Sequence, residues 1–125
     1  MPLLFDMPME KLATYEGRNP RPEDFDAFWD ARLAELEGID PAPEMQPAAF
    51  QAPYARCEDL YYTSTHGARI HAKLLRPAEP AGPGPAVLMF HGYSGMAGQW
   101  TEMLPYVAAG FTVAAMDCRG QGGLS

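Results

Sequence analysis

The sequence is poor in cysteine and in basic residues, and it contains no long apolar run. Its two cysteines, Cys57 and Cys118, stand far apart and outside any C-x-x-C or Cys/His pattern, which excludes a disulfide framework and a zinc site. The 9 Lys and Arg residues form no cluster and are outnumbered by 16 Asp and Glu, so a nucleic-acid partner is excluded as well. No stretch approaches the roughly 18 apolar residues of a membrane span, and we expect no membrane partner.

The features of a secretory signal are also missing. Residues 1–11 lack a basic start, and Pro and Asp interrupt their apolar residues. Because no disulfide pattern points to an oxidising compartment, we expect a cytoplasmic protein. The 125 residues are 47% apolar, which suits one modest domain with a packed core, and 12 Gly with 13 Pro predict many turns.

The first part of the chain is predicted to be helical and then extended. A short helix is expected at about residues 7–15 and a longer one at 22–37. Five apolar residues of the longer helix follow the helical period: Phe25, Phe28, Trp29, Leu33 and Leu36. We interpret this stripe as a face that packs on a core, with an aromatic sugar-binding surface as the alternative. Residues 39–55 carry four prolines and are interpreted as an extended connector.

A β-hairpin is predicted in the middle of the chain. Residues 57–65 and 68–75 are strand-like, and the His66-Gly67 pair between them predicts a turn with a positive φ at the glycine. We therefore divide the chain into a helical extension with a Pro-rich connector at 1–53 and an α/β domain at 54–125.

A βαβ unit is predicted after the hairpin. Continuous apolar runs at 86–91 and 111–117 are typical of strands buried on both faces of a parallel sheet. A helix is expected between them at about 98–109, and Pro105 should kink it or restart it. The two strands should therefore be parallel, with a right-handed crossover.

Glycine-rich segments follow both of these strands. His91-Gly92-Tyr93-Ser94-Gly95 follows the first, and residues 117–123 follow the second. Ligands of an open parallel sheet bind beyond the carboxyl ends of the strands, so we expect the chemistry there. An N–H in the His-Gly-x turn can face a developing oxyanion, and the alternative is a tight turn that merely starts a helix. The spacing does not fit G-x-G-x-x-G, which argues against a dinucleotide cofactor.

Several segments of the sequence resemble one known family. The stretches that carry the resemblance are Met1–Asp6, Gly17–Pro22, Phe25–Trp29, Phe90–Gly95, Trp100, Tyr106–Phe111 and Met116–Gly123. They are similar to the N-terminal part of the acetyl xylan esterase and cephalosporin-C deacetylase family, which is carbohydrate esterase family seven. The combination of Arg119-Gly120-Gln121 with His91-Gly92-Tyr93 is specific, whereas His-Gly alone is common to many α/β-hydrolases.

The resemblance implies the N-terminal part of an α/β-hydrolase sheet, made of the hairpin and the first βαβ unit, with a helical extension before it. It further implies a serine esterase that removes acetyl groups from acetylated xylooligosaccharides and related small acetyl esters. Such an enzyme works without a cofactor or metal and forms a homo-oligomer, often a hexamer. The Tyr93 backbone N–H is then the expected oxyanion donor and substrate contact, and the structural motif residues are His91, Gly92, Asp117, Arg119, Gly120 and Gln121.

The nucleophile elbow of that family, G-x-S-x-G, does not occur in these 125 residues. None of the three serines, Ser64, Ser94 and Ser125, has the required glycines on both sides. We therefore expect an N-terminal portion of such an enzyme that lacks the catalytic triad and is inactive by itself. Two other hypotheses stay open, a non-catalytic assembly or binding module and another α/β-hydrolase, such as a dienelactone-hydrolase-like or peptidase-like enzyme.

Four polar side chains near these turns are interpreted as structural. His66 and His71 are expected to be structural or solvent-facing, and His91 is expected to hold its turn by hydrogen bonds. Asp117 is expected to form a buried pair with Arg119 that orders the loop.

Overall fold

The computed structural model describes residues 7–80 and 82–125. One compact unit ends at Leu33, and Ala34–Ser125 form a second. Residues 1–6, which contribute to the family resemblance, lie outside the described residues. Within the described ranges, no helix combines the length and the apolar character that crossing a membrane requires.

The two predicted N-terminal helices are both present and both shorter than expected. α1 covers only Met9–Leu12, and α2 covers Phe25–Glu37. The aromatic rings of α2 touch one another, with centroids 6.3 Å apart for Phe25 and Trp29 and 5.7 Å apart for Phe28 and Trp29. The packing of this stripe on a core stays a prediction, as does the sugar-binding alternative.

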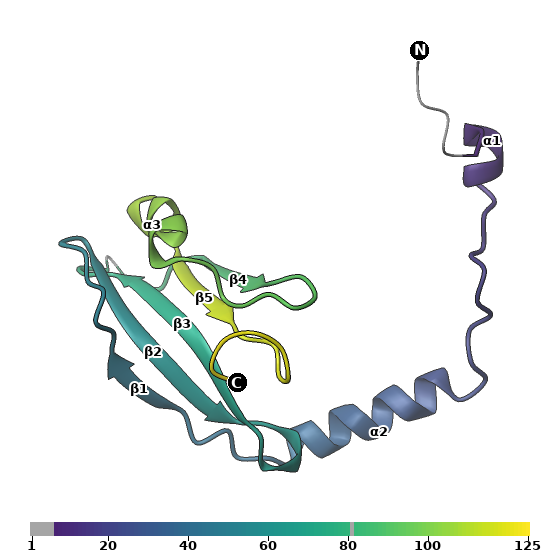
Figure 1. The fold of residues 1–125 in the computed structure, drawn as a ribbon, viewed down its shortest axis with the longest axis horizontal. Coiled ribbons are helices and arrows are strands. Elements are labelled where there is room, and N and C mark those ends of the chain that lie inside the picture. Colours follow the sequence, from purple (N-terminus) through teal and green to yellow (C-terminus); the bar gives the residue numbers. More distant parts are fainter. Residues whose placement is uncertain (1–6, 81) are drawn as a thin grey trace. The chain divides into compact units, whose positions relative to one another are not determined.

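The second unit contains a five-stranded sheet with the order β1-β2-β3-β5-β4 (Figure 1). Its strands are β1 Glu44–Pro47, β2 Ala55–Thr63, β3 Arg69–Pro77, β4 Ala86–Phe90 and β5 Thr112–Met116. β2 and β3 form the predicted antiparallel hairpin, and β4 pairs with β5 in parallel as the βαβ pattern predicted. β3 runs antiparallel to β5, so the sheet contains both parallel and antiparallel pairs.

The connector predicted at residues 39–55 is partly wrong, because it contains β1. This strand pairs antiparallel with β2, from Glu44 opposite Tyr61 to Pro47 opposite Glu58. The sequence Glu-Met-Gln-Pro contains no β-branched or aromatic residue and ends in proline, so the pairing depends on the open edge of β2 rather than on local preference.

The hairpin turn confirms the predicted positive φ at Gly67. The turn is a short 3-10 helix, Thr65–Gly67, in which Gly67 has a φ of 69° and His66 a φ of 59°. His66 thus shares the left-handed conformation that glycine adopts without steric cost.

α3, Trp100–Ala108, connects β4 to β5 and packs on one face of the sheet (Figure 1). Its first turn is held by the Gln99 N–H, which donates to Glu102 Oε2 at 2.9 Å. The helix does not restart at Pro105, although proline removes one helical hydrogen bond there. Met103 and Val107, on either side of the proline, are both buried in the core and hold the helix on the sheet.

The core lies between α3 and the sheet, and the opposite face of β4 is exposed. Leu75 and Val113 are fully buried on the α3 side. Leu88 and Phe90 point the other way and are 69% and 65% exposed. The prediction that this strand is buried on both faces is therefore wrong for the described chain, in which β4 forms one edge of the sheet and only one face is covered.

We expect a polypeptide of these 125 residues to self-associate through β4, because an apolar edge strand offers unpaired N–H and C=O groups to another chain. Light scattering after size-exclusion chromatography should show species larger than a monomer. The double substitution Leu88→Lys and Phe90→Lys should restore the monomer, whereas Met45→Lys on the other edge strand, β1, should not. A sharp monomer peak for the unsubstituted chain would contradict this expectation.

Candidate active site

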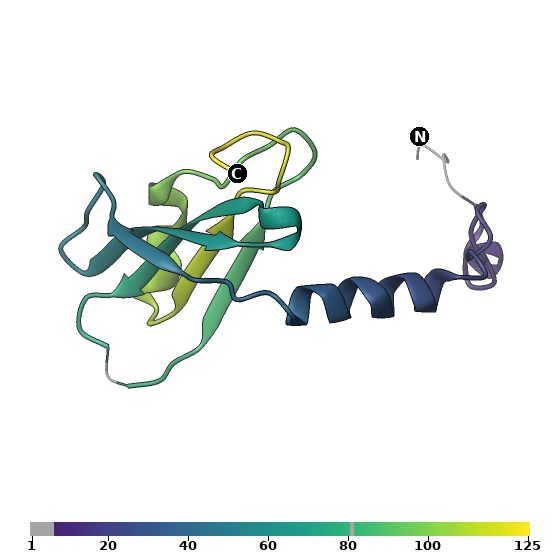
Figure 2. The ribbon, with the colours of Figure 1, turned by 90° about the horizontal axis from the view of Figure 1, so that it is seen from below.

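Two loops meet at the carboxyl ends of the parallel strands. The β4 loop, residues 91–99, and the β5 loop, residues 117–125, lie side by side, as Figure 2 shows in green and yellow. β3 starts at the same edge, because it runs antiparallel to β5. The predicted glycine-rich segments are therefore brought together, at the end of the sheet where ligands bind in open α/β folds.

Asp117, directly after β5, connects the two loops through its carboxylate. Oδ1 accepts a hydrogen bond from the Ala97 N–H at 2.6 Å, and Oδ2 accepts one from the Leu124 N–H at 3.1 Å. Gly123 has a φ of +94°, and a Cβ atom there would collide with this carboxylate. One side chain that is 3% exposed thus holds both loops.

His71 of β3 is the ionisable partner of Asp117. Its Nδ1 lies 2.6 Å from Asp117 Oδ2, and its Nε2 lies 3.0 Å from Asp59 Oδ1 on β2. The imidazole is 2% exposed, so both of its nitrogens have the partners that burial requires. The interpretation of His71 as a structural residue agrees with this position, but its charged partners were not predicted.

The predicted pair between Asp117 and Arg119 is wrong. The β3–β5 register places Ala72 opposite Met116, and the Asp117 N–H donates to the His71 carbonyl oxygen at 3.0 Å. The strand pairing therefore brings Asp117 to His71. Arg119 lies beyond the sheet and donates instead to the Thr65 carbonyl oxygen of the hairpin turn at 3.0 Å.

The hydrogen bonds around Asp117 lower its pKa. Burial acts to raise the pKa of this carboxyl group, because it penalises the charged form. Hydrogen bonds from the Ala97 N–H, the His71 ring and the Leu124 N–H outweigh burial, so the pKa lies below its ordinary value.

This lowered pKa predicts an acid-sensitive contribution to stability. Because the unfolded chain takes up the proton at a higher pH, the contribution is complete above the unfolded pKa of about 3.9 and is lost as the pH falls through the lower folded value. Between about pH 5 and pH 2, the free energy of unfolding measured in urea should fall more steeply with decreasing pH for the natural sequence than for Asp117→Asn. Equal slopes for the two proteins would contradict the prediction.

His91 links the two loops at the start of the β4 loop. Its Nε2 accepts a hydrogen bond from the Cys118 N–H at 2.8 Å, so this nitrogen carries no proton. The proton is therefore on Nδ1, which donates to the Gly92 carbonyl oxygen at 2.8 Å. The predicted role of His91 in holding its turn corresponds to these two contacts.

Two further contacts join the loops at their tips. Gln121 Oε1 accepts a hydrogen bond at 2.7 Å from the N–H of Ser94, a residue with the left-handed φ of 60°. A Cβ atom on Gly122 would lie 2.6 Å from the Gly95 carbonyl oxygen, so the two backbones approach too closely for a side chain. Gly120 of the β5 loop has a φ of 73°, a left-handed conformation that glycine adopts without steric cost.

Lys73 of β3 is a site residue that the sequence analysis did not single out. Its Nζ donates to the Gly98 carbonyl oxygen at 2.6 Å and lies 5.2 Å from the centre of the Trp100 ring. In a strand, alternate residues share a face, which places His71 and Lys73 on the side of the buried Leu75. That alternation is the signal that could have identified both residues.

The Tyr93 N–H has no hydrogen-bond partner among the described residues. The tyrosine is 95% exposed. The next two N–H groups are both engaged, because Ser94 donates to Gln121 and Gly95 donates to the Gly92 carbonyl oxygen at 3.0 Å. Tyr93 therefore presents an unpaired donor on a loop that is fixed on both sides.

The described residues do not supply a nucleophile with a base. Ser125 Oγ accepts a hydrogen bond from the backbone N–H of His71 at 2.8 Å, so the imidazole of His71 is not its partner. The unprotonated nitrogen of His91 accepts the Cys118 backbone N–H. Residues 7–80 and 82–125 also contain no group of three or more His, Cys, Asp or Glu that could hold a metal ion. The arrangement can therefore stabilise a negative charge through the Tyr93 backbone N–H, and the described residues do not provide the attacking group.

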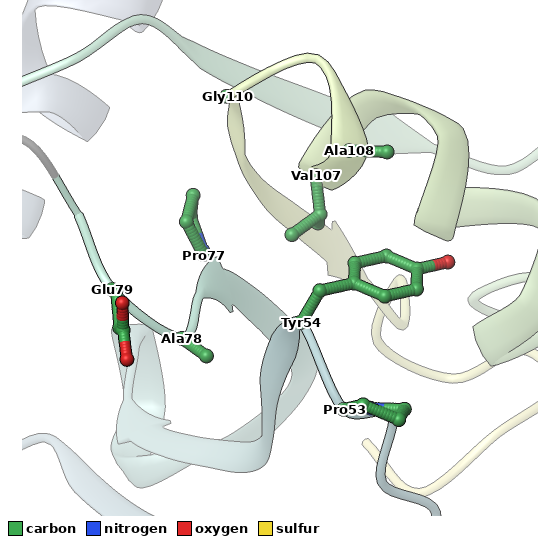
Figure 3. A pocket seen from close by; sticks show the side chains of 8 residues that line it. All are labelled: Pro53, Tyr54, Pro77, Ala78, Glu79, Val107, Ala108 and Gly110. Carbon is green, nitrogen blue, oxygen red and sulfur yellow. The ribbon is translucent and has the colours of Figure 1, made fainter.

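A pocket of about 590 Å³ lies at the other end of the sheet (Figure 3). It is formed by the end of β3, the end of α3 and the start of β2: Pro53, Tyr54, Pro77, Ala78, Glu79, Val107, Ala108 and Gly110. Gly110 precedes β5, whereas the two loops follow β4 and β5 at their carboxyl ends. The pocket is therefore separate from the candidate active site.

The parallel pair, the α3 crossover and the two linked loops make this chain the N-terminal part of an α/β-hydrolase sheet. A solved acetyl xylan esterase 1 from Thermoanaerobacterium sp. JW/SL YS485 is 54% identical and superposes with a TM-score of 0.90. An acetyl xylan esterase from Paenibacillus sp. R4 is 30% identical, with a TM-score of 0.82. The acetyl xylan esterase (AXE1) family model matches residues 1–125, and the chain belongs to this family.

The chain spans little more than a third of these relatives. The match covers 95% of the chain and 37% of the Thermoanaerobacterium protein, and 94% of the chain and 38% of the Paenibacillus protein.

Proposed function

We propose that this chain is the N-terminal portion of a serine esterase that removes acetyl groups from acetylated xylooligosaccharides and related small acetyl esters. In this proposal the chain supplies an oxyanion donor, and the nucleophile and its base come from sequence beyond residue 125. The full-length enzyme below means the chain together with that sequence.

The unpaired N–H of Tyr93 carries the proposal. Acyl transfer passes through a tetrahedral intermediate whose oxygen becomes negative, and a fixed backbone N–H stabilises that charge. Such a donor contributes on the order of 3 kcal/mol of transition-state stabilisation. The loop contacts through Asp117, His91 and Gln121 support this role, because they fix the backbone around Tyr93 before substrate binds.

Four finer expectations belong to the same proposal. The family resemblance supports activity on the acetyl group of cephalosporin C and assembly into a homo-oligomer, often a hexamer. The scarcity of cysteine supports a cytoplasmic location. No cofactor is needed, because a serine mechanism uses only side chains and backbone donors.

A substrate panel tests the proposal. The full-length enzyme should release acetate from acetylated xylooligosaccharides and from p-nitrophenyl acetate, and a serine-directed phosphonate should abolish both activities. A dienelactone and a peptide anilide serve as substrates for the other α/β-hydrolases considered. Hydrolysis of either of these without acetate release would favour another hydrolase, and no turnover of any substrate would favour a non-catalytic module.

A further inference from the structure

We propose that His91 is a positioning residue that sets the direction of the Tyr93 N–H. The inference rests on the proposed function, because it assigns a role in presenting the oxyanion donor. The His91 side chain does not touch the reacting atoms. It acts through the peptide group between Gly92 and Tyr93.

The hydrogen bonds of the His91 imidazole determine which of its nitrogens carries the proton. A backbone N–H can only donate, so the 2.8 Å contact from Cys118 makes Nε2 an acceptor. A neutral imidazole then carries its proton on Nδ1, and that N–H donates to the Gly92 carbonyl oxygen at 2.8 Å. The β5 loop therefore selects the tautomer that can hold Gly92.

The Gly92 carbonyl oxygen is held by two donors from the same loop. Besides the His91 ring, the Gly95 N–H donates to it at 3.0 Å. A Cβ atom at position 95 would lie 3.0 Å from this oxygen and 3.0 Å from His91 Nδ1, so the imidazole, the carbonyl group and Gly95 are closely packed. The carbonyl group thus faces the interior of the turn and has little freedom to rotate.

A trans peptide group transmits this orientation to the next residue. All described peptide bonds are trans, and in a trans peptide the N–H points opposite to the C=O. Because the Gly92 carbonyl faces the His91 ring, the Tyr93 N–H faces away from it, out of the turn. Loss of the Nδ1 donor would leave the Gly95 N–H as the one remaining donor to this carbonyl oxygen, so the peptide plane would be held less firmly and the oxyanion donor would be misdirected.

Two substitutions separate the two contacts of the ring. His91→Asn places an amide N–H near the position of Nδ1 and can still donate to the Gly92 carbonyl oxygen. His91→Gln reaches the position of Nε2 and can accept the Cys118 N–H, but it leaves Gly92 without its side-chain donor. In the full-length enzyme we expect His91→Gln to lower kcat about 100-fold with KM within about 3-fold, because misplaced catalytic groups reduce the chemical step. His91→Asn should stay within about 5-fold of the natural kcat.

His66→Asn is the matched control, because His66 lies in the hairpin turn and Asn tolerates its left-handed φ of 59°. It should keep the natural kcat. The proposal is overturned if His91→Gln keeps the natural kcat, if both His91 variants lose kcat equally, or if only KM changes.

A spectroscopic measurement on the unsubstituted enzyme does not depend on whether the variants fold. Nitrogen-15 NMR of labelled histidine should show His91 as the neutral Nδ1–H tautomer, and the Nε2–H tautomer would overturn the proposal. The tautomer of His91 tests this proposal alone. The proposed function is tested separately, because it fails if the unsubstituted enzyme releases no acetate, whichever tautomer His91 has.

Discussion

A polypeptide of these 125 residues is expected to hydrolyse p-nitrophenyl acetate roughly 10⁶-fold more slowly than the full-length enzyme, since removal of a serine triad costs about this factor in kcat. The chain has the proposed oxyanion loop but no G-x-S-x-G elbow, and Nε2 of His91 already accepts the Cys118 N–H. Initial rates of p-nitrophenol release, with the spontaneous rate subtracted, measure the effect.

Ser94 provides the control for this prediction. It lies in the β4 loop, and no base in the described structure is paired with its hydroxyl group. Ser94→Ala should therefore leave the residual rate of the 125-residue chain unchanged. A burst of product that Ser94→Ala abolishes would show that the chain carries its own nucleophile.

Asp117→Ala is expected to reduce the free energy of unfolding by about 3–5 kcal/mol, because it leaves the buried Nδ1 of His71 and two backbone N–H groups without their partner, at about 1–3 kcal/mol for each buried group. The substitution removes the acceptor of the Ala97 and Leu124 N–H groups, and it leaves Asp59 as the remaining hydrogen-bond partner of the His71 ring among the described residues. Urea unfolding of the full-length enzyme at neutral pH, followed by far-UV circular dichroism, measures the change.

Asp59→Ala is the comparison for that measurement. Asp59 contacts the other nitrogen of the same ring at 3.0 Å, but its side chain is 29% exposed, so water can replace it. We expect a cost of about 1 kcal/mol. Equal costs for the two substitutions would show that Asp117 has no special place in the loop network.

The sheet could be predicted from the sequence where burial dictates the pattern. The apolar runs that became β4 and β5, and the hairpin of β2 and β3, follow from periodicity and turn residues. β1 could not be predicted, because nothing in the local sequence of Glu44–Pro47 favours a strand and the segment becomes one by pairing with the edge of β2. The exposure of Leu88 and Phe90 could not be predicted either, because it depends on which elements lie beside β4.

The position of the site could be predicted from the strand ends, but its contacts could not. Asp117 and Arg119 are two residues apart in the sequence, which suggested a pair, whereas His71 is 46 residues from Asp117. Only the β3–β5 register brings His71 to that carboxylate. In the same way, the contact from Gln121 to the Ser94 N–H depends on how closely Gly95 and Gly122 approach.

The proposed oxyanion donor of the β4 loop is the backbone N–H of Tyr93. The most direct measurement is a crystal structure of the full-length enzyme with an acyl phosphonate bound covalently to its nucleophile. We expect the phosphonyl oxygen to lie about 2.7–3.1 Å from the Tyr93 backbone nitrogen. An oxygen more than about 3.5 Å from that nitrogen, or one held only by other donors, would contradict it.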